Sequence, residues 1–547
     1  MRRGAGLPGA LAIIQSQVKN RLLLFLALAL ASGSIPAETL PNGDAACVAI
    51  STSTNACWWA GIIDHGFQMP LTNGYEADLF ADTYGNQGQP LLLSSQGDVI
   101  WSDDAFSIHL SQGGLLIEPE GGRLQRAKSG DSLREAFLYA SKTCFPASGK
   151  MPDDLLFLSP QYNTWIELMY DQNQSDIIKY ANGIRDNGFP AGVLMIDDNW
   201  QQNYGQWDFK RDKFPDPKAM IALLHADGFK VMLWMCPFVN TNSDPYQHLA
   251  HRNLLLKDHS RSPALIKWWN GESALLDFTN PEAVDWFCAR LDYLRSTYNV
   301  DGFKFDGGDS SFYKGTIAAK PVPPNTHSEL YGRIGLQYPL NEFRAMWKMG
   351  GQPLAERLRD KDHSWTDLGK LIPNMLLAGL MGYPFSCPDM IGGGEYKSFQ
   401  AGSTIDQELV VRSAQCHALM PMMQFSVAPW RVLDHPHLKA VLKAVELREE
   451  HEYYILSLAR QSAFTGEPVV RSMEYVFPHQ GYERVNDQFF LGDHILVAPV
   501  LVKGLRHKEV ILPIGAWKGF DGKRYTGPAQ ISLPVAYDQL CYFEKLE

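Results

Sequence analysis

Residues 191–235 decide the fold class: they begin with Ala-Gly-Val-Leu-Met-Ile (191–196) and end with Lys-Val-Met-Leu-Trp-Met (230–235). Both ends are short apolar runs with the length of a buried strand. Between them, Asp216-Pro217 marks the start of an amphipathic helix and Asp227-Gly228 marks its end. A strand, a helix and a second strand in this order predict a β-α-β unit and therefore a parallel sheet.

The same pattern recurs along the middle of the chain. Asn280-Pro281-Glu282 predicts the start of another helix, and a strand at 302–305 follows it. Counting from Trp165 gives roughly eight strand–helix repeats in about 310 residues, which favours a closed (β/α)₈ barrel over an open sheet. Further strands are expected at 382–387, 421–426 and 468–473, and further helices near Leu371, Leu409 and Ala440.

Strand-like segments flank the predicted barrel on both sides. Towards the N-terminus, short apolar runs such as Pro90-Leu91-Leu92-Leu93 alternate with turn residues, as in an antiparallel β-sandwich. Towards the C-terminus, runs such as His494-Ile495-Leu496-Val497 predict a small β-domain. We therefore expect an α/β protein with a β-sandwich at 38–150, a TIM barrel at 151–478 and a C-terminal β-domain at 479–547.

The composition is that of a folded globular protein. Of the 547 residues, 45% are hydrophobic and 20% are charged, which argues against wholesale disorder and against a multi-span membrane protein. The net charge is −11 and no run of basic residues stands out, so nucleic acid is not an expected partner. The sequence leaves open whether copies of the chain form a homo-oligomer.

The N-terminus has the pattern of a signal peptide. Basic residues precede an apolar run at 22–31 that ends in Ala-Leu-Ala. Cleavage is expected after Ala31, with Ala37 as the second choice, and an uncleaved anchor is the alternative. The mature protein would then be secreted or periplasmic without a stable membrane span. In such a compartment Cys47 and Cys57 are close enough in sequence for a local disulfide.

No motif predicts a metal or an organic cofactor. The chain lacks a P-loop, a GxSxG nucleophile elbow, an HExxH zinc helix and any CxxC pair. Asp434-His435-Pro436-His437 contains side chains that bind metals, but without further ligands nearby it favours the start of a helix. We therefore expect a protein that works without a cofactor.

The segment 301–309, Asp-Gly-Phe-Lys-Phe-Asp-Gly-Gly-Asp, carries the clearest chemical signal. Alternate residues of a barrel strand face the lumen, so Lys304 and Asp306 share the inner face. Gly307 and Gly308 end the strand at the carboxyl-terminal mouth, where barrel enzymes have their active sites. The neighbouring ammonium is expected to lower the pKa of Asp306 and keep it ionised, as a nucleophile must be. A structural ion pair is compatible with the same spacing.

A second predicted strand ends in two carboxylates, Asp197 and Asp198. Carboxylates accept hydrogen bonds from sugar hydroxyls, and indole rings stack on the C–H faces of sugars. Trp165, Trp234 and Trp269 lie near strand ends, although each alone more often belongs to a core. Carboxylates and indoles together predict a saccharide pocket.

A third cluster, Arg-Leu-Arg-Asp-Lys-Asp-His-Ser-Trp at 357–365, lies on a polar loop ahead of a helix. A solvated helix start is the simplest interpretation. If the loop closes over the barrel mouth, Asp360 or Asp362 would face Asp306 at the separation of about 5 Å that retaining glycoside hydrolysis needs. The spacing does not choose between the two aspartates.

Several motifs, in the same order along the chain, resemble those of glycoside hydrolase family 31. Within it, the chain resembles the branch that includes myogenesis-regulating glycosidase and some α-galactosidases. The resemblance implies a β-sandwich, a (β/α)₈ barrel and a C-terminal β-domain. The motifs are Phe214-Pro-Asp-Pro217, Asp277-Phe-Thr-Asn-Pro281, Lys304-x-Asp306, Gly382-Tyr-Pro-Phe-Ser-Cys-Pro-Asp-Met-Ile391 and Leu491-Gly-Asp-His-Ile-Leu-Val-Ala-Pro499.

The resemblance also implies roles for individual residues. Asp306 takes the place of the catalytic nucleophile. Alignment on Trp365 and Asp389 places the general acid/base at Asp360, and Arg344, 16 positions earlier, matches a sugar-binding arginine. The other pocket residues expected are Asp197, Asp198, Trp165, Trp234, Trp269 and Lys304, with Asp309, Arg357 and Asp362 as further candidates.

Departures from the family pattern bear on the substrate. Many α-glucosidases of the family have Arg-Asn-His where this chain has Gln424-Phe425-Ser426, and Trp or His in place of Arg357. The loop after Trp200 lacks the arginine-containing pattern that binds a sulfonate. The prediction is therefore a retaining exo-α-glycosidase for a neutral hexose, with α-galactosides as the first choice of substrate. α-Glucosidase, α-xylosidase and transglycosylase are alternatives on the same site, and a non-catalytic carbohydrate-binding protein is the alternative from another class.

Overall fold

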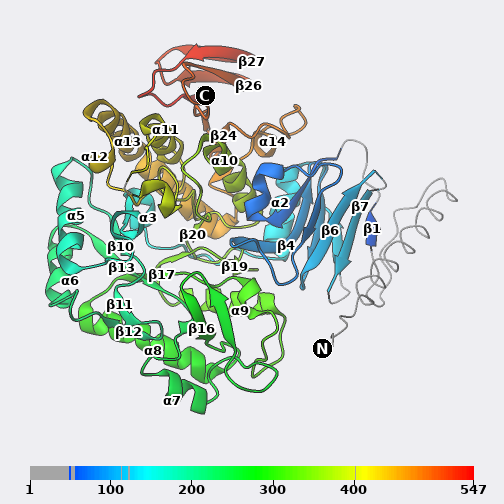
Figure 1. Cartoon of the computed structure of the whole chain (residues 1–547). Coiled ribbons are helices and arrows are strands. Elements are labelled where there is room, and N and C mark those ends of the chain that lie inside the picture. Colours follow the sequence, from blue (N-terminus) through cyan, green and yellow to red (C-terminus); the bar gives the residue numbers. More distant parts are fainter. Residues whose placement is uncertain (1–47, 51–55, 113, 121–123, 401, 547) are drawn as a thin grey trace, which may run out of the picture. The chain divides into compact units, whose positions relative to one another are not determined.

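The computed structural model describes residues 48–50, 56–112, 114–120, 124–400 and 402–546 (Figure 1). The predicted signal peptide at 1–31 and Cys47 of the proposed disulfide lie outside these residues. Within them, no helix is long and apolar enough to cross a membrane. The domain limits at 38, 150 and 478 stay predictions.

Eight parallel strands form the central sheet, in the order β21-β20-β18-β17-β13-β10-β9-β22. A parallel bridge between Met390, which follows β21, and Gln424 of β22 brings the two ends of the sheet together. The sheet is thus a nearly closed barrel, and the predicted fold class is confirmed. The strands are β9 (Gln161–Asn163), β10 (Val193–Ile196), β13 (Lys230–Met235), β17 (Gly302–Phe305), β18 (Leu340–Phe343), β20 (Glu356–Arg357), β21 (Ser386–Cys387) and β22 (Gln424–Phe425).

Helices alternate with these strands along the chain, and Figure 1 shows α5, α6 and α8 along one side of the barrel. The predicted helix starts are confirmed, because Asp216 and Asn280 accept hydrogen bonds from the backbones of Ala219 and Glu282. Asp434 likewise accepts from the backbone of His437, so its cluster begins a helix. The main helices are α5 (Gln174–Asp186), α6 (Pro217–Ala226), α8 (Pro281–Tyr298), α9 (Pro324–Gly335), α10 (Trp365–Leu380), α11 (Gln407–Ala418) and α13 (His435–Thr465).

One strand predicted for the barrel belongs elsewhere. β23 (Val470–Arg471), expected as part of a barrel strand at 468–473, pairs antiparallel with β24 (Phe489–Leu491) in the C-terminal sheet. Trp165 does not begin the repeats either, since it starts the short helix α4 (Trp165–Leu168) just after β9. A short apolar run does not reveal which sheet it joins.

Two antiparallel sheets precede the barrel, as predicted. One has the order β1-β7-β6-β3 and the other contains β4, β5 and β8, with β2 also paired to β4. Unexpectedly, β19 (Met346–Trp347) leaves the barrel region and pairs parallel with β4. The strands are β1 (Val48–Ile50), β2 (Trp58–Ile62), β3 (Glu76–Asp78), β4 (Gln87–Ser94), β5 (Asp98–Ser102), β6 (Phe106–Ser111), β7 (Gly114–Pro119) and β8 (Leu124–Lys128).

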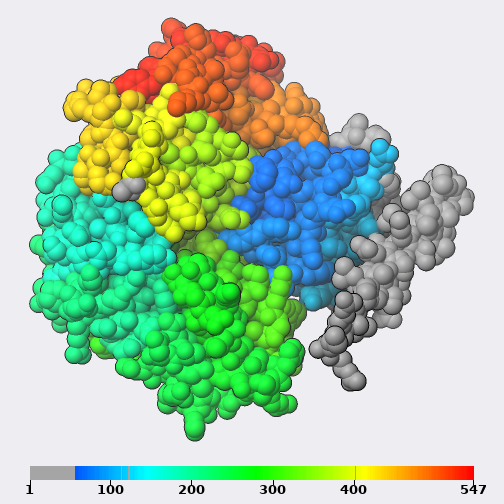
Figure 2. All heavy atoms as spheres, in the orientation of Figure 1, coloured from blue at the N-terminus to red at the C-terminus, as the bar shows by residue number. Residues whose placement is uncertain are grey.

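A six-stranded antiparallel sheet ends the chain, in the order β23-β24-β25-β28-β26-β27. It has its own small core around Phe490, Trp517 and Phe543. Figure 2 shows this red part packed on the yellow helices, and Arg412 of α11 donates there to the carbonyl oxygens of Ala536 and Gln539. The remaining strands are β25 (Ile495–Val497), β26 (His507–Gly519), β27 (Arg524–Pro534) and β28 (Tyr542–Leu546).

Candidate active site

The carboxyl ends of neighbouring barrel strands bring charged side chains together. Asp306 follows β17, Arg344 follows β18, and Arg357 is the last residue of β20. Asp360 and Asp389 lie a few residues beyond β20 and β21. Because the carboxyl ends of parallel strands open at the same mouth of a barrel, these residues line one rim.

Three donors hold the carboxylate of Asp306. Its Oδ1 accepts hydrogen bonds from Arg344 Nε at 2.8 Å and from the backbone N–H of Gly307 at 2.8 Å. Its Oδ2 accepts from Trp234 Nε1 at 3.1 Å. Burial works to raise the pKa of Asp306, but Arg344, Lys304 and the Trp234 hydrogen bond together hold it well below its usual value. The carboxylate is therefore ionised at neutral pH.

Lys304 does not pair with Asp306, contrary to the sequence argument. Its ammonium donates to Asp197 Oδ2 at 2.6 Å, and both side chains are buried. In the barrel sheet Lys304 lies in register between Trp234 of β13 and Glu342 of β18. It lowers the pKa of Asp306 by its charge alone, and Arg344 supplies the direct contact.

Arg344 also anchors Asp309. Its two terminal nitrogens donate to the two carboxylate oxygens of Asp309 at 3.0 and 2.7 Å, and Nη1 donates to the carbonyl of Gly85 at 2.6 Å. A Cβ on Gly85 would lie 3.3 Å from Nη1, at a position whose φ of +73° favours glycine. The guanidinium lies 5.5 Å from the ring centroid of Trp269. Arg344 thus contacts three side chains: it forms ion pairs with the candidate nucleophile Asp306 and with Asp309, and it lies near the exposed ring of Trp269.

Arg357 forms a second carboxylate–guanidinium unit on the rim. Its Nη1 donates to Asp360 Oδ1 at 2.7 Å and to Asp389 Oδ1 at 2.6 Å. Asp389 is buried, whereas 40% of the Asp360 side chain is exposed. Burial raises the pKa of Asp389, Arg357 opposes the shift, and the charge of Asp360 adds to it. A Cβ on Gly394 would lie 2.9 Å from both Oδ1 atoms, so glycine leaves room for the pair.

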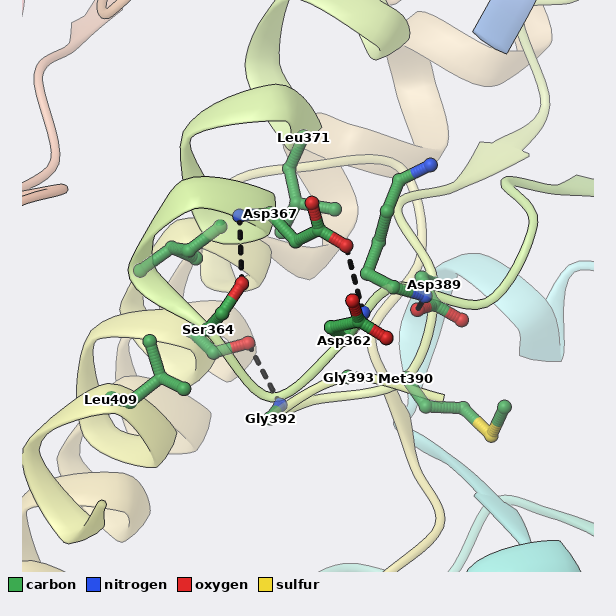
Figure 3. Close-up of a pocket in the computed structure, with 12 residues that line it drawn as sticks. Asp362, Ser364, Asp367, Leu371, Asp389, Met390, Gly392, Gly393 and Leu409 are labelled. Atoms are coloured by element: carbon green, nitrogen blue, oxygen red, sulfur yellow. Dashed lines mark hydrogen bonds between the residues drawn. The ribbon is translucent and has the colours of Figure 1, made fainter. Parts of the chain in front are cut away.

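Asp362 lies in a different environment. Its backbone N–H donates to Asp367 Oδ2 at 2.8 Å, in the first turn of α10. Figure 3 shows Asp362 beside a small cavity of about 10 Å³, whose lining also includes Ser364 and Asp389. Asp360 shares Arg357 with Asp389, whereas Asp362 is tied to the helix start. Which of the two is the acid/base stays a prediction.

The three tryptophans lie at different depths. Trp234 is buried and contacts Asp306, whereas 47% of Trp269 is exposed. Trp165 packs edge-on against Tyr170, with ring centroids 5.3 Å apart. The Tyr170 hydroxyl donates to the side chain of Asn270, the residue after Trp269. Trp234 and Trp269 thus lie next to the Asp306–Arg344 pair, whereas Trp165 is connected to it only through Tyr170 and Asn270. Their role in a saccharide pocket stays a prediction.

Asp198 is buried among side chains that sequence reasoning missed. Its carboxylate accepts from Tyr204 at 3.0 Å, from Asn270 at 2.7 Å and from Gln201 at 3.1 Å. Burial raises the pKa of Asp198 to about 7, although the hydrogen bonds from Gln201 and Tyr204 oppose this shift. Tyr204 follows β11 (Gln201–Asn203) and Asn270 lies between β15 (Leu265–Trp268) and β16 (Gly271–Leu275), in hairpins without a local chemical pattern. Asp389 was named only as part of a family motif; its position after a predicted strand could have marked it as a site residue.

Two family models match the chain: the TIM-barrel domain of glycosyl hydrolases family 31 at residues 160–350, and the C-terminal domain of the same family at 466–545. The chain belongs to glycoside hydrolase family 31. The predicted family is confirmed, whereas the α-galactosidase branch stays a prediction.

Similar proteins support the family 31 assignment. Myogenesis-regulating glycosidase of Mus musculus is 35% identical over 432 residues, which are 76% of this chain and 60% of that protein. Isomaltosyltransferase of Sporosarcina globispora is 27% identical, over 70% of this chain and 40% of that protein. The chain thus spans 60% and 40% of the lengths of these relatives. A Flavobacterium johnsoniae dextranase structure, FjDex31A, complexed with glucose, has a TM-score of 0.79 at 19% identity, covering 90% of this chain and 66% of that one.

The family 31 departures at 424–426 have a structural explanation. Gln424 points into the barrel, where its amide donates to Glu342 at 2.6 Å and to Gln161 at 2.9 Å. Ser426, where many family α-glucosidases have histidine, accepts the backbone N–H of Ile166 at 2.7 Å. Both side chains therefore form hydrogen bonds with other residues of the chain.

Proposed function

We propose that this chain is a retaining exo-α-glycosidase, which removes a terminal non-reducing α-linked hexose. One observation carries the proposal: two carboxylate–guanidinium pairs lie on the same barrel rim, Asp306 with Arg344 and Asp360 with Arg357. Retaining glycosidases use such a pair of carboxyl groups, one as nucleophile and one as acid/base. Family membership and the names of the relatives agree with this chemistry.

The reaction follows from these positions. Asp306 attacks the anomeric carbon while Asp360 gives its proton to the glycosidic oxygen, so that bond breaks and a glycosyl ester forms on Asp306. Asp360 then takes a proton from water, and the water oxygen attacks the anomeric carbon and releases Asp306. The site needs no cofactor for these steps.

We propose α-galactosides as the first substrates to test, because the motifs resemble the branch that contains α-galactosidases. Ser426 and Arg357 also depart from the usual α-glucosidase pattern. The similarity to an isomaltosyltransferase favours a second candidate, transglycosylation on the same residues with a sugar as acceptor. The signal-like segment at 1–31 supports action outside the cytoplasm, in the periplasm or as a secreted protein.

The test is hydrolysis of aryl α-glycosides (galactoside, glucoside, xyloside and N-acetylgalactosaminide) by the chain from residue 32 onward. We expect one sugar to be clearly preferred, and Asp306→Asn to lower its kcat at least about 1000-fold because no covalent ester can form. Near-wild-type turnover by Asp306→Asn would contradict the nucleophile assignment. No turnover with any glycoside, together with saturable stabilisation by a sugar in thermal unfolding, would support the non-catalytic alternative.

A further inference from the structure

The residues on either side of Asp360 share one carboxylate from the N-terminal part of the chain. Asp64 Oδ2 accepts a hydrogen bond from Arg359 Nη1 at 3.2 Å, and Asp64 Oδ1 accepts one from Lys361 Nζ at 3.1 Å. The side chain of Asp360, between them, binds Arg357 instead. This three-residue stretch is therefore held from two sides, and the proposed chemistry does not use Asp64.

We propose that Asp64 is a positioning residue, which holds the loop at 358–362 where the acid/base can reach the glycosidic oxygen. The inference rests on the proposed function, because it assigns to Asp64 an effect on the proton transfer that this loop performs. It holds for either candidate acid/base, since Asp360 and Asp362 both lie beside the residue that Asp64 buries as an ion pair, Lys361.

Asp64 belongs to an element that is itself fixed against the barrel. It lies in the 3₁₀ helix η1 (Ile63–Gln68), where the backbone N–H of Phe67 donates to Asn374 Oδ1 of α10 at 3.1 Å. The acid/base loop leads into the same helix, which begins at Trp365. Both partners of the ion pair are thus anchored to α10, so the carboxylate is a fixed point for the loop.

Lys361 makes the contact with Asp64 costly to lose. Its side chain is only 6% exposed, and Asp64 is the one acceptor that the described part of the chain gives its ammonium. Its backbone N–H donates to Asp389 Oδ2 at 2.8 Å, and Asp389 shares Arg357 with Asp360. A buried ammonium without a partner is strongly unfavourable. Without the Asp64 charge, we expect this side chain to turn towards water and to move the backbone beside Asp360.

Arg359 adds a second, weaker contact. Its side chain is 49% exposed, and its Nη1 also donates to the carbonyl of Tyr84 at 3.3 Å. Its backbone N–H donates to Asn86 Oδ1 at 3.3 Å, so Arg359 keeps other partners when Asp64 is replaced. Exposed ion pairs contribute little, and the buried pair of Asp64 with Lys361 therefore supplies most of the positioning.

The test uses two aryl α-glycosides of the same sugar that differ in the leaving group, phenol or dinitrophenol. Departure of phenol needs a proton from the acid/base, whereas dinitrophenol leaves with little acid catalysis. We expect Asp64→Asn, which keeps the shape of the side chain, to lower the ratio of kcat/KM for the phenyl glycoside to kcat/KM for the dinitrophenyl glycoside by about 5-fold or more.

Asp98→Asn is the matched control. Asp98 lies in β5 of the N-terminal sheets and also pairs with one arginine and one lysine, Arg126 and Lys128 of β8. Its loss removes an ion pair of the same kind away from the loop, so the wild-type ratio should persist. A fall of less than about 5-fold in Asp64→Asn, including an equal loss with both substrates, would overturn the proposal, and so would the same fall in Asp98→Asn.

Failure of the proposed function gives a different result. If the wild-type protein hydrolyses no glycoside, amide hydrogen exchange of peptides that cover 358–363 measures the hold on the loop directly. Exchange at least about 5-fold faster in Asp64→Asn, but unchanged in Asp98→Asn, would support Asp64 as the anchor of the loop without the proposed catalysis. A smaller increase in Asp64→Asn, or the same increase in both variants, would overturn the inference.

Discussion

Arg357 shares one guanidinium nitrogen between two carboxylates, exposed Asp360 and buried Asp389. This arrangement holds the Asp360 carboxyl group at the rim, where 40% of its side chain is exposed. The alternative residue, Asp362, is tied through its backbone to the start of α10. The two possible assignments of the acid/base, to Asp360 or to Asp362, therefore predict opposite outcomes when each aspartate is replaced.

Asp360→Asn should slow the second half-reaction when the leaving group is an activated dinitrophenol, because departure of that group needs little acid catalysis. We expect kcat to fall about 100- to 1000-fold, and azide to restore turnover with formation of a glycosyl azide. Asp362→Asn should keep kcat within about 2-fold of wild type. If the azide rescue appears with Asp362→Asn instead, the acid/base assignment moves by two positions.

Asp198 should make the stability of the protein depend on pH. Its pKa of about 7 in the folded state exceeds the value of about 3.9 in an unfolded chain. The folded state then binds the proton more tightly, so this carboxyl stabilises the fold at low pH. That contribution, on the order of 4 kcal/mol, is lost as the pH rises from about 4 to 7. Asp198→Asn should therefore flatten the fall of Tm between pH 5 and pH 8; an unchanged slope would show that Asp198 is ionised in the folded protein.

The residues of the site were predictable where the chemistry is local to one strand end. Asp306 and Asp309 follow a strand that the sequence predicted, so the strand end marks them. Arg344 and Asp360 also follow barrel strands, but those strands were not predicted, and only the family resemblance pointed to the two residues. The partner of Lys304 was not predictable, because it depends on which side chains the neighbouring strands bring alongside. Tyr204 and Asn270 come from hairpins outside the barrel repeat, which no periodicity indicates.

At the scale of elements, the helices follow from the sequence better than the strands. Asp216, Asn280 and Asp434 each begin a helix by accepting a backbone hydrogen bond, so short polar signals locate α6, α8 and α13. In contrast, β20, β21 and β22 have two residues each, too few for an alternating pattern. In the predicted strand at 382–387, the chain turns at Gly382, whose φ is +83°, and the strand β21 begins only after this turn.

At the scale of the whole molecule, the segment that begins β4 of the N-terminal sheets forms hydrogen bonds with the backbone of the candidate active-site rim. The Asn86 amide donates to the carbonyls of Arg344 at 2.8 Å and of Arg357 at 3.0 Å. The neighbouring Gln87 donates to the Arg344 carbonyl at 2.9 Å. The backbones of both guanidinium residues are thus held by the same short segment, which connects the N-terminal sheets to the strand ends that carry the candidate catalytic groups.

Asn86→Ala should remove one of the two side-chain donors that these carbonyls share and leave only Gln87, whose hydrogen bond to the Arg357 carbonyl is longer, at 3.3 Å. We expect the free energy of unfolding to fall by about 1–3 kcal/mol, and kcat to fall as both arginines shift. Urea unfolding and aryl glycoside kinetics measure the two effects. Gln461→Ala, at an exposed position of α13, is the control and should change neither. Loss of stability without any loss of kcat would show that these hydrogen bonds do not position the site.

The pairing of β19 with β4 has a consequence for biosynthesis. It joins residues roughly 260 positions apart in the chain. A ribosome that adds about 5–20 residues per second exposes β4 at least about 13 s before β19 has been made. The N-terminal sheet therefore stays incomplete in the nascent polypeptide until the middle of the barrel has been translated. Such long-range pairing slows folding. Chaperone binding to newly made chains should concentrate in this interval.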